Sequence, residues 1–279
     1  MSVLHALYAL MDALPGRWLD YMFMKNALLA MLLIAPLFGM LGTMAVDNKM
    51  AFFSDALGHS ALTGIAIGVV LGMEIQLAAM LVFGVCWAAM ITFVKQHSKM
   101  SADTIISVFS STSIALGLVV LSRGGAFARY SNLLVGDVLS VTGGDLLALL
   151  GALVATFAVW AALFNPLMLV SVNAPLAQSR GVRAKLTEYA FTALVAVAVM
   201  VSIRWVGVML INSLLILPAA ASRNVARSAA GYMRLSVLFA LVCGVAGLAL
   251  SFYLNTSAGA AVVLLLAAVY FATLPLRRR

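Results

Sequence analysis

Residues 27–46 read ALLAMLLIAPLFGMLGTMAV, and residues 52–71 read FFSDALGHSALTGIAIGVVL. The first stretch carries no charged side chain, and the second carries one aspartate and one histidine among apolar and small residues. An α-helix rises about 1.5 Å per residue, so about 20 residues span the roughly 30 Å of hydrocarbon in a bilayer. The two stretches therefore predict two neighbouring transmembrane helices.

Similar apolar stretches recur along the chain. Of its 279 residues, 65% are hydrophobic and 9% are charged, and the mean hydropathy is +1.12. Soluble domains carry about a quarter charged residues, so this composition excludes a soluble protein. We predict an all-α polytopic membrane protein with about eight or nine transmembrane helices, forming a single transmembrane domain over residues 1–279. The predicted spans are 27–46, 52–71, 75–94, 104–122, 146–164, 189–203, 206–221, 235–254 and 258–276.

The first 26 residues differ from the spans that follow. His5, Asp12, Arg17 and Asp20 interrupt their apolar residues. Residues 1–26 are therefore predicted to form an amphipathic segment at the membrane interface and not a cleavable signal. The net charge is +8, but the lysines and arginines are not gathered in a basic domain, which argues against nucleic acid as a partner.

Lysine and arginine fall unevenly on the two sides of the predicted bundle, and cytoplasmic loops carry an excess of both. Segments 47–50, 95–103, 165–187 and 222–234 and the C-terminus together hold twelve of the 17. This side is predicted to be cytoplasmic, with the N-terminus outside and the C-terminus inside. The twelve are Lys49, Lys95, Lys99, Arg180, Arg183, Lys185, Arg223, Arg227, Arg234, Arg277, Arg278 and Arg279, and the other five are Arg17, Lys25, Arg123, Arg129 and Arg204.

Two connecting stretches are too long to be plain turns. On the cytoplasmic side, residues 165–187 read NPLMLVSVNAPLAQSRGVRAKLT and are predicted to form one or two short helices at the surface. On the outer side, residues 123–145 include Asp137 and Asp145. Either stretch can be a connector or a docking surface, and the sequence leaves both readings open.

Asp55 and His59 are ionisable residues inside a predicted span. Counted from Lys49 at the cytoplasmic interface, they lie about 9 and 15 Å into the hydrocarbon. An aspartate there costs about 2.5–3.5 kcal/mol and is usually functional. Their i,i+4 spacing places both on one helix face, which Thr63 continues. A carboxylate and an imidazole suit Zn²⁺, Mn²⁺ or Fe²⁺. The alternative is an Asp–His hydrogen bond that only stabilises the bundle.

Other polar and small residues mark packing faces and further positions for a pathway. Gly64, Gly68 and Gly72 form a small-residue series on another side of the same helix, which favours close helix packing. In a later span, Asn212 and Ser213 place polar groups at mid-depth. With Thr63, these two residues are candidates to line a pathway. Interhelical hydrogen bonding explains Asn212 equally well.

A series of short motifs runs in order along the chain from about residue 27. They are Lys49-Met50 with residues 54–62 and Gly64, Asp103-Thr104 with 115–119, 135–139 with Asp145-Leu146, Gly181-Val182, and Val206-Gly207 with 214–220. Together they resemble the permease subunits of the bacterial zinc/manganese/iron ABC importers. The resemblance covers nearly the whole chain.

This resemblance implies the compact type II fold, like that of the vitamin B12 importer, in the bacterial cytoplasmic (inner) membrane. It implies a homodimer, a cytoplasmic ATP-binding subunit and an extracytoplasmic metal-binding protein. Asp55 and His59 match the family's metal pair, and no permanently bound cofactor is implied. Some zinc-transporting relatives carry a histidine where Ser110-Ser111 stands here, so the metal stays open among Zn²⁺, Mn²⁺ and Fe²⁺. The residues that match the family's ATPase-coupling segment are Leu176, Ala177, Arg180, Gly181 and Val182.

The sequence bears on three functional classes: an ABC permease, an ion-coupled secondary carrier and an intramembrane enzyme. The sequence contains no G-x-x-x-x-G-K-[ST] loop, so a permease would depend on a separate chain to hydrolyse ATP. An ion-coupled secondary carrier would use Asp55 and His59 as a proton relay. An intramembrane enzyme is disfavoured, because His-Glu-x-x-His is absent and residues 58–62 lack the second glycine of a nucleophile elbow.

Overall fold

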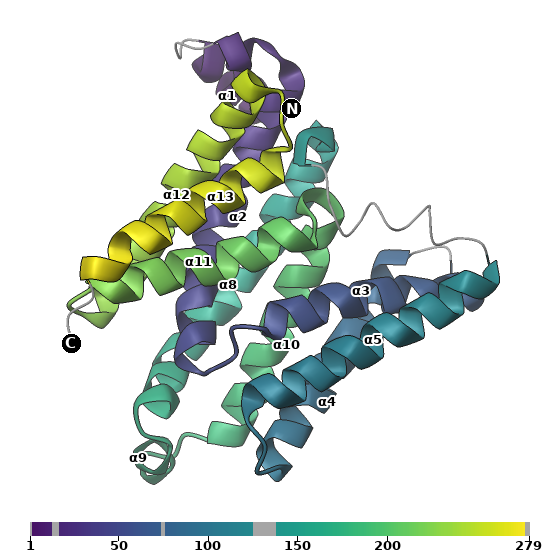
Figure 1. Cartoon of the computed structure of the whole chain (residues 1–279), viewed down its shortest axis with the longest axis vertical. Helices are drawn as coiled ribbons and strands as arrows, with labels where there is room; N and C mark the ends of the chain where they lie inside the picture. Colours follow the sequence, from purple (N-terminus) through teal and green to yellow (C-terminus); the bar gives the residue numbers. More distant parts are fainter. Residues whose placement is uncertain (1, 13–16, 74–75, 125–137, 277–279) are drawn as a thin grey trace.

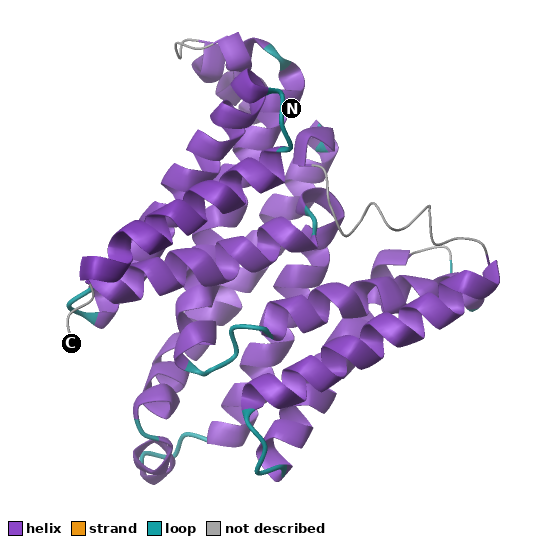
Figure 2. Cartoon of the chain, viewed as in Figure 1, coloured by secondary structure: helices purple, strands orange, loops and turns teal. Residues whose placement is uncertain are grey.

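The computed structural model describes residues 2–12, 17–73, 76–124 and 138–276, and the regular elements in these ranges are helical (Figure 2). Among these residues, nine helices are long and apolar enough to cross a membrane, which confirms the predicted fold class. The helices are α1 (Ser2–Asp12), η1 (Arg17–Asp20), α2 (Met22–Asp47), α3 (Phe53–Val70), α4 (Gln76–His97), α5 (Ala102–Gly124), η2 (Val138–Ser140), α8 (Gly143–Val172), α9 (Ala174–Ser179), α10 (Ala184–Val206), α11 (Val208–Val225), α12 (Ala229–Leu254), α13 (Ala258–Thr273) and η3 (Leu274–Leu276).

The helices form two groups that α8 and α10 join (Figure 1). In the first group, α11 packs against α2, α12 and α13. In the second, α3 packs against α4 and α5. The α10 helix contacts both α4 and α8, and α8 contacts α2. The chain crosses between the groups at residues 48–52, which join α2 to α3, and at Gly207, which alone separates α10 from α11.

Glycine permits the close contacts inside the first group. A β-carbon at Gly42 of α2 would overlap the main-chain carbonyl of Leu215 in α11. One turn earlier, the carbonyl of Gly39 accepts a hydrogen bond from Ser236 Oγ of α12 at 2.7 Å. The α2 helix therefore touches both neighbours with its backbone.

The N-terminal boundary of the first span was predicted too late. Helix α2 begins at Met22, so residues 22–26 continue the membrane-length helix that contains the first predicted span. The charge at Lys25 did not end the span, because its ammonium pairs with the carboxylate of Asp12 in α1. Asn26 is held similarly: its carboxamide bonds Tyr8 of α1 and the main-chain carbonyl of Val141.

The connector in the stretch 165–187, which was predicted to be cytoplasmic, is shorter than predicted. Helix α8 continues through Pro166 to Val172, and α10 already begins at Ala184. A proline inside a helix removes one backbone hydrogen bond, but the apolar residues that follow Pro166 extend the helix. Only residues 173–183 lie between the two long helices, and they contain one short helix, α9.

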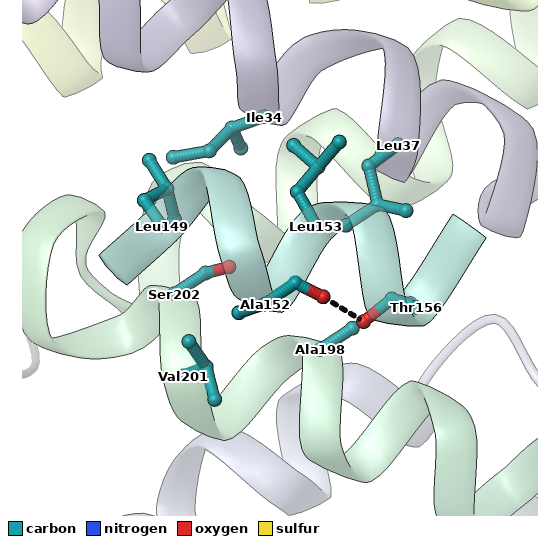
Figure 3. Close-up of a pocket in the computed structure, with 9 residues that line it drawn as sticks. All are labelled: Ile34, Leu37, Leu149, Ala152, Leu153, Thr156, Ala198, Val201 and Ser202. Atoms are coloured by element: carbon teal, nitrogen blue, oxygen red, sulfur yellow. Dashed lines mark hydrogen bonds between the residues drawn. The ribbon is translucent and has the colours of Figure 1, made fainter. Parts of the chain in front are cut away.

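A small cavity lies between α2, α8 and α10 (Figure 3). Its volume is about 10 Å³, near the minimum for one water molecule. The Thr156 hydroxyl at its edge donates to Ala152 O at 2.8 Å, within its own helix. This cavity is too small to be a transport path.

The charge asymmetry that predicts orientation rests partly on residues outside the described ranges, namely Arg129, Arg277, Arg278 and Arg279. Asp137 also lies outside them. Asp145 forms a capping box with Thr142 at the start of α8. The placement of the termini on the two sides of the membrane stays a prediction.

Candidate functional site

The candidate site begins where the chain turns from α2 into α3. At the end of α2, the Met50 N–H donates to Ala45 O at 2.8 Å and the Lys49 N–H to Val46 O at 3.2 Å. This is the Schellman pattern, and Lys49 adopts the left-handed conformation it requires, with φ of 57°. Asp55 then falls in the first turn of α3. The positive end of the helix dipole lies at this turn.

Asp55 and His59 lie together on one face of α3, as their spacing predicts. His59 Nε2 lies 3.6 Å from Asp55 Oδ2, and the side chains of His59 and Asp55 are 24% and 41% exposed. This separation is too long for a strong hydrogen bond. Two ligands that each lie about 2.1 Å from one ion at an angle of about 110–120° would be separated by about 3.4–3.6 Å. The pair therefore has the separation that a shared metal ion requires.

Asn212 joins the pair from another helix. Its Nδ2 donates to Asp55 Oδ1 at 2.9 Å, so the two carboxylate oxygens face different partners. Asn212 Oδ1 is buried and has no hydrogen-bond partner. Ser213, the next residue, directs its hydroxyl to Met209 O at 2.9 Å within α11. The site thus gathers a carboxylate, an imidazole and a carboxamide from α3 and α11.

The contact between α3 and α11 depends on Gly58. A β-carbon at Gly58 would overlap the side chain of Val208. The missing side chain lets α11 approach closely enough for Asn212 to reach Asp55. Neither Gly58 nor Val208 was among the predicted site residues. The only available signal was a glycine directly before His59.

The remaining α3 residues divide between two neighbours. Thr63 is fully buried, and its Oγ1 donates to Ser113 O of α5 at 2.6 Å. The hydroxyl is thus used between α3 and α5 within one chain, and a place for Thr63 along the pathway stays a prediction. Gly64 and Gly68 face α4, where added β-carbons would crowd Met80 and Ala79.

Gly72 does not belong to this packing face. It lies beyond the end of α3 with φ of 65°, and among the described residues no atom outside its chain neighbours would lie within 4 Å of an added β-carbon. The Met73 N–H donates to Gly68 O and the Gly72 N–H to Val69 O, a Schellman cap. The prediction that Gly72 packs against another helix is wrong. Its role is to end α3.

The predicted coupling residues surround α9. Leu176 is 47% exposed, whereas Ala177 is fully buried. Gly181 has φ of 80° and, with Val182, closes a third Schellman cap by donating to Gln178 O and Ala177 O. Arg180 is exposed. This part of the chain is a short, firmly capped helix that presents Leu176 to its surroundings.

Among the described residues, no third histidine, cysteine, aspartate or glutamate joins Asp55 and His59 within one chain. The pair accordingly offers one nitrogen and one carboxylate group, with the Asn212 carboxamide beside them.

Residues 20–277 match the model of the ABC 3 transport family. The chain belongs to this family. It is 32% identical over 252 residues to the manganese import system permease ScaB of Streptococcus parasanguinis, covering 90% of this chain and 89% of the relative. It is 28% identical over 254 residues to the high-affinity zinc uptake membrane protein ZnuB of Haemophilus influenzae, covering 91% and 97%.

Solved structures agree with this membership of the ABC 3 transport family. PsaBC from Streptococcus pneumoniae, solved with a Fab, matches with a TM-score of 0.78 and 27% identity over 91% of each chain. A metal-chelate type ABC transporter in an inward-facing conformation matches with a TM-score of 0.72 over 98% of each chain, and at 12% identity it shows the fold alone. The chain is a multi-pass ABC importer permease and not an enzyme, and the secondary-carrier alternative is not favoured.

Proposed function

We propose that this permease passes Mn²⁺ or Zn²⁺ across the bacterial cytoplasmic membrane, with Asp55 and His59 as the transient ion site. The relatives named for manganese and zinc support these two metals. The observation that carries the site is the separation of 3.6 Å between His59 Nε2 and Asp55 Oδ2. Fe²⁺ would suit the same ligands.

The ligand set favours brief occupancy over tight storage. Asp55 Oδ1 is engaged by Asn212 while Oδ2 faces His59. An incoming ion therefore meets an oriented carboxylate and need not reorganise it. Protein sites that hold Zn²⁺ structurally use four ligands, and one chain supplies fewer. A homodimer with its twofold axis beside α3 would supply two aspartates and two histidines.

The proposed assembly has two further partners. An ATP-binding subunit contacts the cytoplasmic segment around α9, where Leu176 is exposed. An extracytoplasmic metal-binding protein delivers the ion to the opposite side. The whole chain acts as one permease domain, with the N-terminus outside and the C-terminus in the cytoplasm, as the lysine and arginine distribution indicates.

Substitution of the pair tests the ion site. Asp55→Asn or His59→Ala in the complete transporter is expected to lower Mn²⁺ and Zn²⁺ uptake into proteoliposomes by at least roughly tenfold. The reason is that each change removes the carboxylate or the imidazole of the proposed ion site. His97→Ala is the matched control, since His97 is exposed at the end of α4 and bonds only Phe93 O of its own helix. Uptake at the wild-type rate by both site variants, with correctly inserted protein, would exclude the assignment.

A further inference from the structure

A partly buried ionic contact links α2, α4 and α10. In the last turn of α4, Lys95 Nζ lies 2.8 Å from Glu188 Oε1 in α10. The same ammonium donates to the main-chain carbonyl of Asn48, at the end of α2, over 3.4 Å. The side chains of Lys95 and Glu188 are only 20% and 25% exposed. Solvent and salt therefore screen this pair less than an exposed surface pair.

Each acceptor lies next to a functional segment. Glu188 falls in the second turn of α10, which follows α9 through the cap at Gly181. Asn48 begins the connection of residues 48–52 that leads to Asp55 in α3. The contacts thus run without a break from α9 through α10 to Lys95. From Lys95 they continue through residues 48–52 to α3, the helix that carries Asp55 and His59.

The other groups around this contact fix its two ends. Gln96 Nε2 donates to Glu188 Oε2 at 3.0 Å, so both carboxylate oxygens of Glu188 are engaged. On the other side of the connection, Asp47 Oδ1 lies 3.6 Å from an Arg223 guanidinium that is 61% exposed. Exposed pairs hold little energy. Of the two ionic contacts beside residues 48–52, the one made by Lys95 is therefore the less exposed to solvent.

We propose that Lys95 is a positioning residue that transmits movement of α9 and the start of α10 to residues 48–52, and so to Asp55. This inference rests on the proposed function. An ammonium carries three donors, so Lys95 can hold a carboxylate of one helix and a main-chain carbonyl of another at once. When α10 shifts with α9, the connection before α3 shifts with it. The test of this role measures the coupling between ATP hydrolysis and metal transport.

The test compares Lys95→Met with the wild-type permease, each assembled with its ATP-binding subunit and binding protein in proteoliposomes. The measured quantity is Mn²⁺ transported per ATP hydrolysed. We expect Lys95→Met to lower this ratio roughly fivefold or more, while Mn²⁺ bound per purified complex stays within about twofold of wild type. Lys95→Arg, which keeps the charge and the donors, should retain most of the ratio. Lys99→Met is the matched control, because Lys99 is exposed in the turn after α4.

Two further variants keep the test decisive. In Lys95→Met/Glu188→Gln, the loss should equal that of Lys95→Met alone, because the partners act through one contact. Glu188→Gln replaces Lys95→Met if the latter fails to assemble, with the same criterion. A wild-type Mn²⁺-to-ATP ratio in Lys95→Met, or additive losses in the double variant, would overturn the inference. A wild-type complex that transports neither Mn²⁺ nor Zn²⁺ would instead refute the proposed function.

Discussion

Gly58 determines how closely α11 can approach Asp55 and His59. An alanine there would place a methyl group inside the space that Val208 occupies, and overpacking of this kind costs about 1–3 kcal/mol. We expect Gly58→Ala to displace α11 and to weaken the contact between Asn212 and Asp55. Metal uptake and the thermal unfolding midpoint in detergent should both fall.

A second substitution separates this crowding from a general helix effect. Gly58→Ala/Val208→Ala removes the clashing methyl groups of valine, so uptake and the unfolding midpoint should recover in part. Gly151→Ala is the control, because Gly151 of α8 has open space around it. A Gly58→Ala protein with normal uptake would show that the close approach of α3 and α11 is not needed.

The sequence predicts which site residues contact each other only where the two residues share a helix. Asp55 and His59 lie one turn apart, so helical periodicity predicts their meeting. The Asp55–Asn212 hydrogen bond joins residues 157 positions apart, and no local pattern encodes such a distance. The contact of Thr63 with α5 could not be predicted for a related reason. Periodicity gives the direction of a side chain but not which neighbouring helix fills that side, and here α5 does.

At the scale of elements, α9 offers the exposed apolar side chain of Leu176 for docking. Leu176→Glu places a charge on that surface. We expect the ATP-binding subunit to be lost on co-purification, or its ATP hydrolysis to continue without metal transport. Gln178→Glu is the control, because Gln178 is also exposed but lies on the opposite side of this short helix. Intact assembly and coupled transport in Leu176→Glu would make residues 173–183 a simple connector.

Hydropathy predicted the number of long helices but not all of their ends. A window of apolar residues identifies a span because a helix that crosses the hydrocarbon core needs about 20 consecutive, mainly apolar residues. The ends depend on single partners that hydropathy does not detect. Lys25 stays within α2 because Asp12 neutralises it, and Asn26 does so because Tyr8 and Val141 satisfy its carboxamide.

At the scale of the whole molecule, two copies of the chain are needed if the ion site is shared. Permeases that carry two different affinity tags can be isolated as a mixed pair, with Asp55→Asn in only one copy. A shared site makes the mixed pair transport far less than half as fast as wild type, because every ion meets the altered copy. Two independent paths would leave about one half. The mixed pair without any substitution is the control for tagging and purification.

Gly207 also has a consequence for how the protein is made. It has φ of 84°, and it is the single residue between α10 and α11. No polar segment separates the two helices, so we expect them to enter the bilayer together as one helical hairpin. When this hairpin arrives, α4 and α8 are already synthesised and can receive α10, and α2 can receive α11. The hairpin is thus the point in biosynthesis at which the α3–α5 group and the α2 group become tied together, before α12 and α13 complete the bundle.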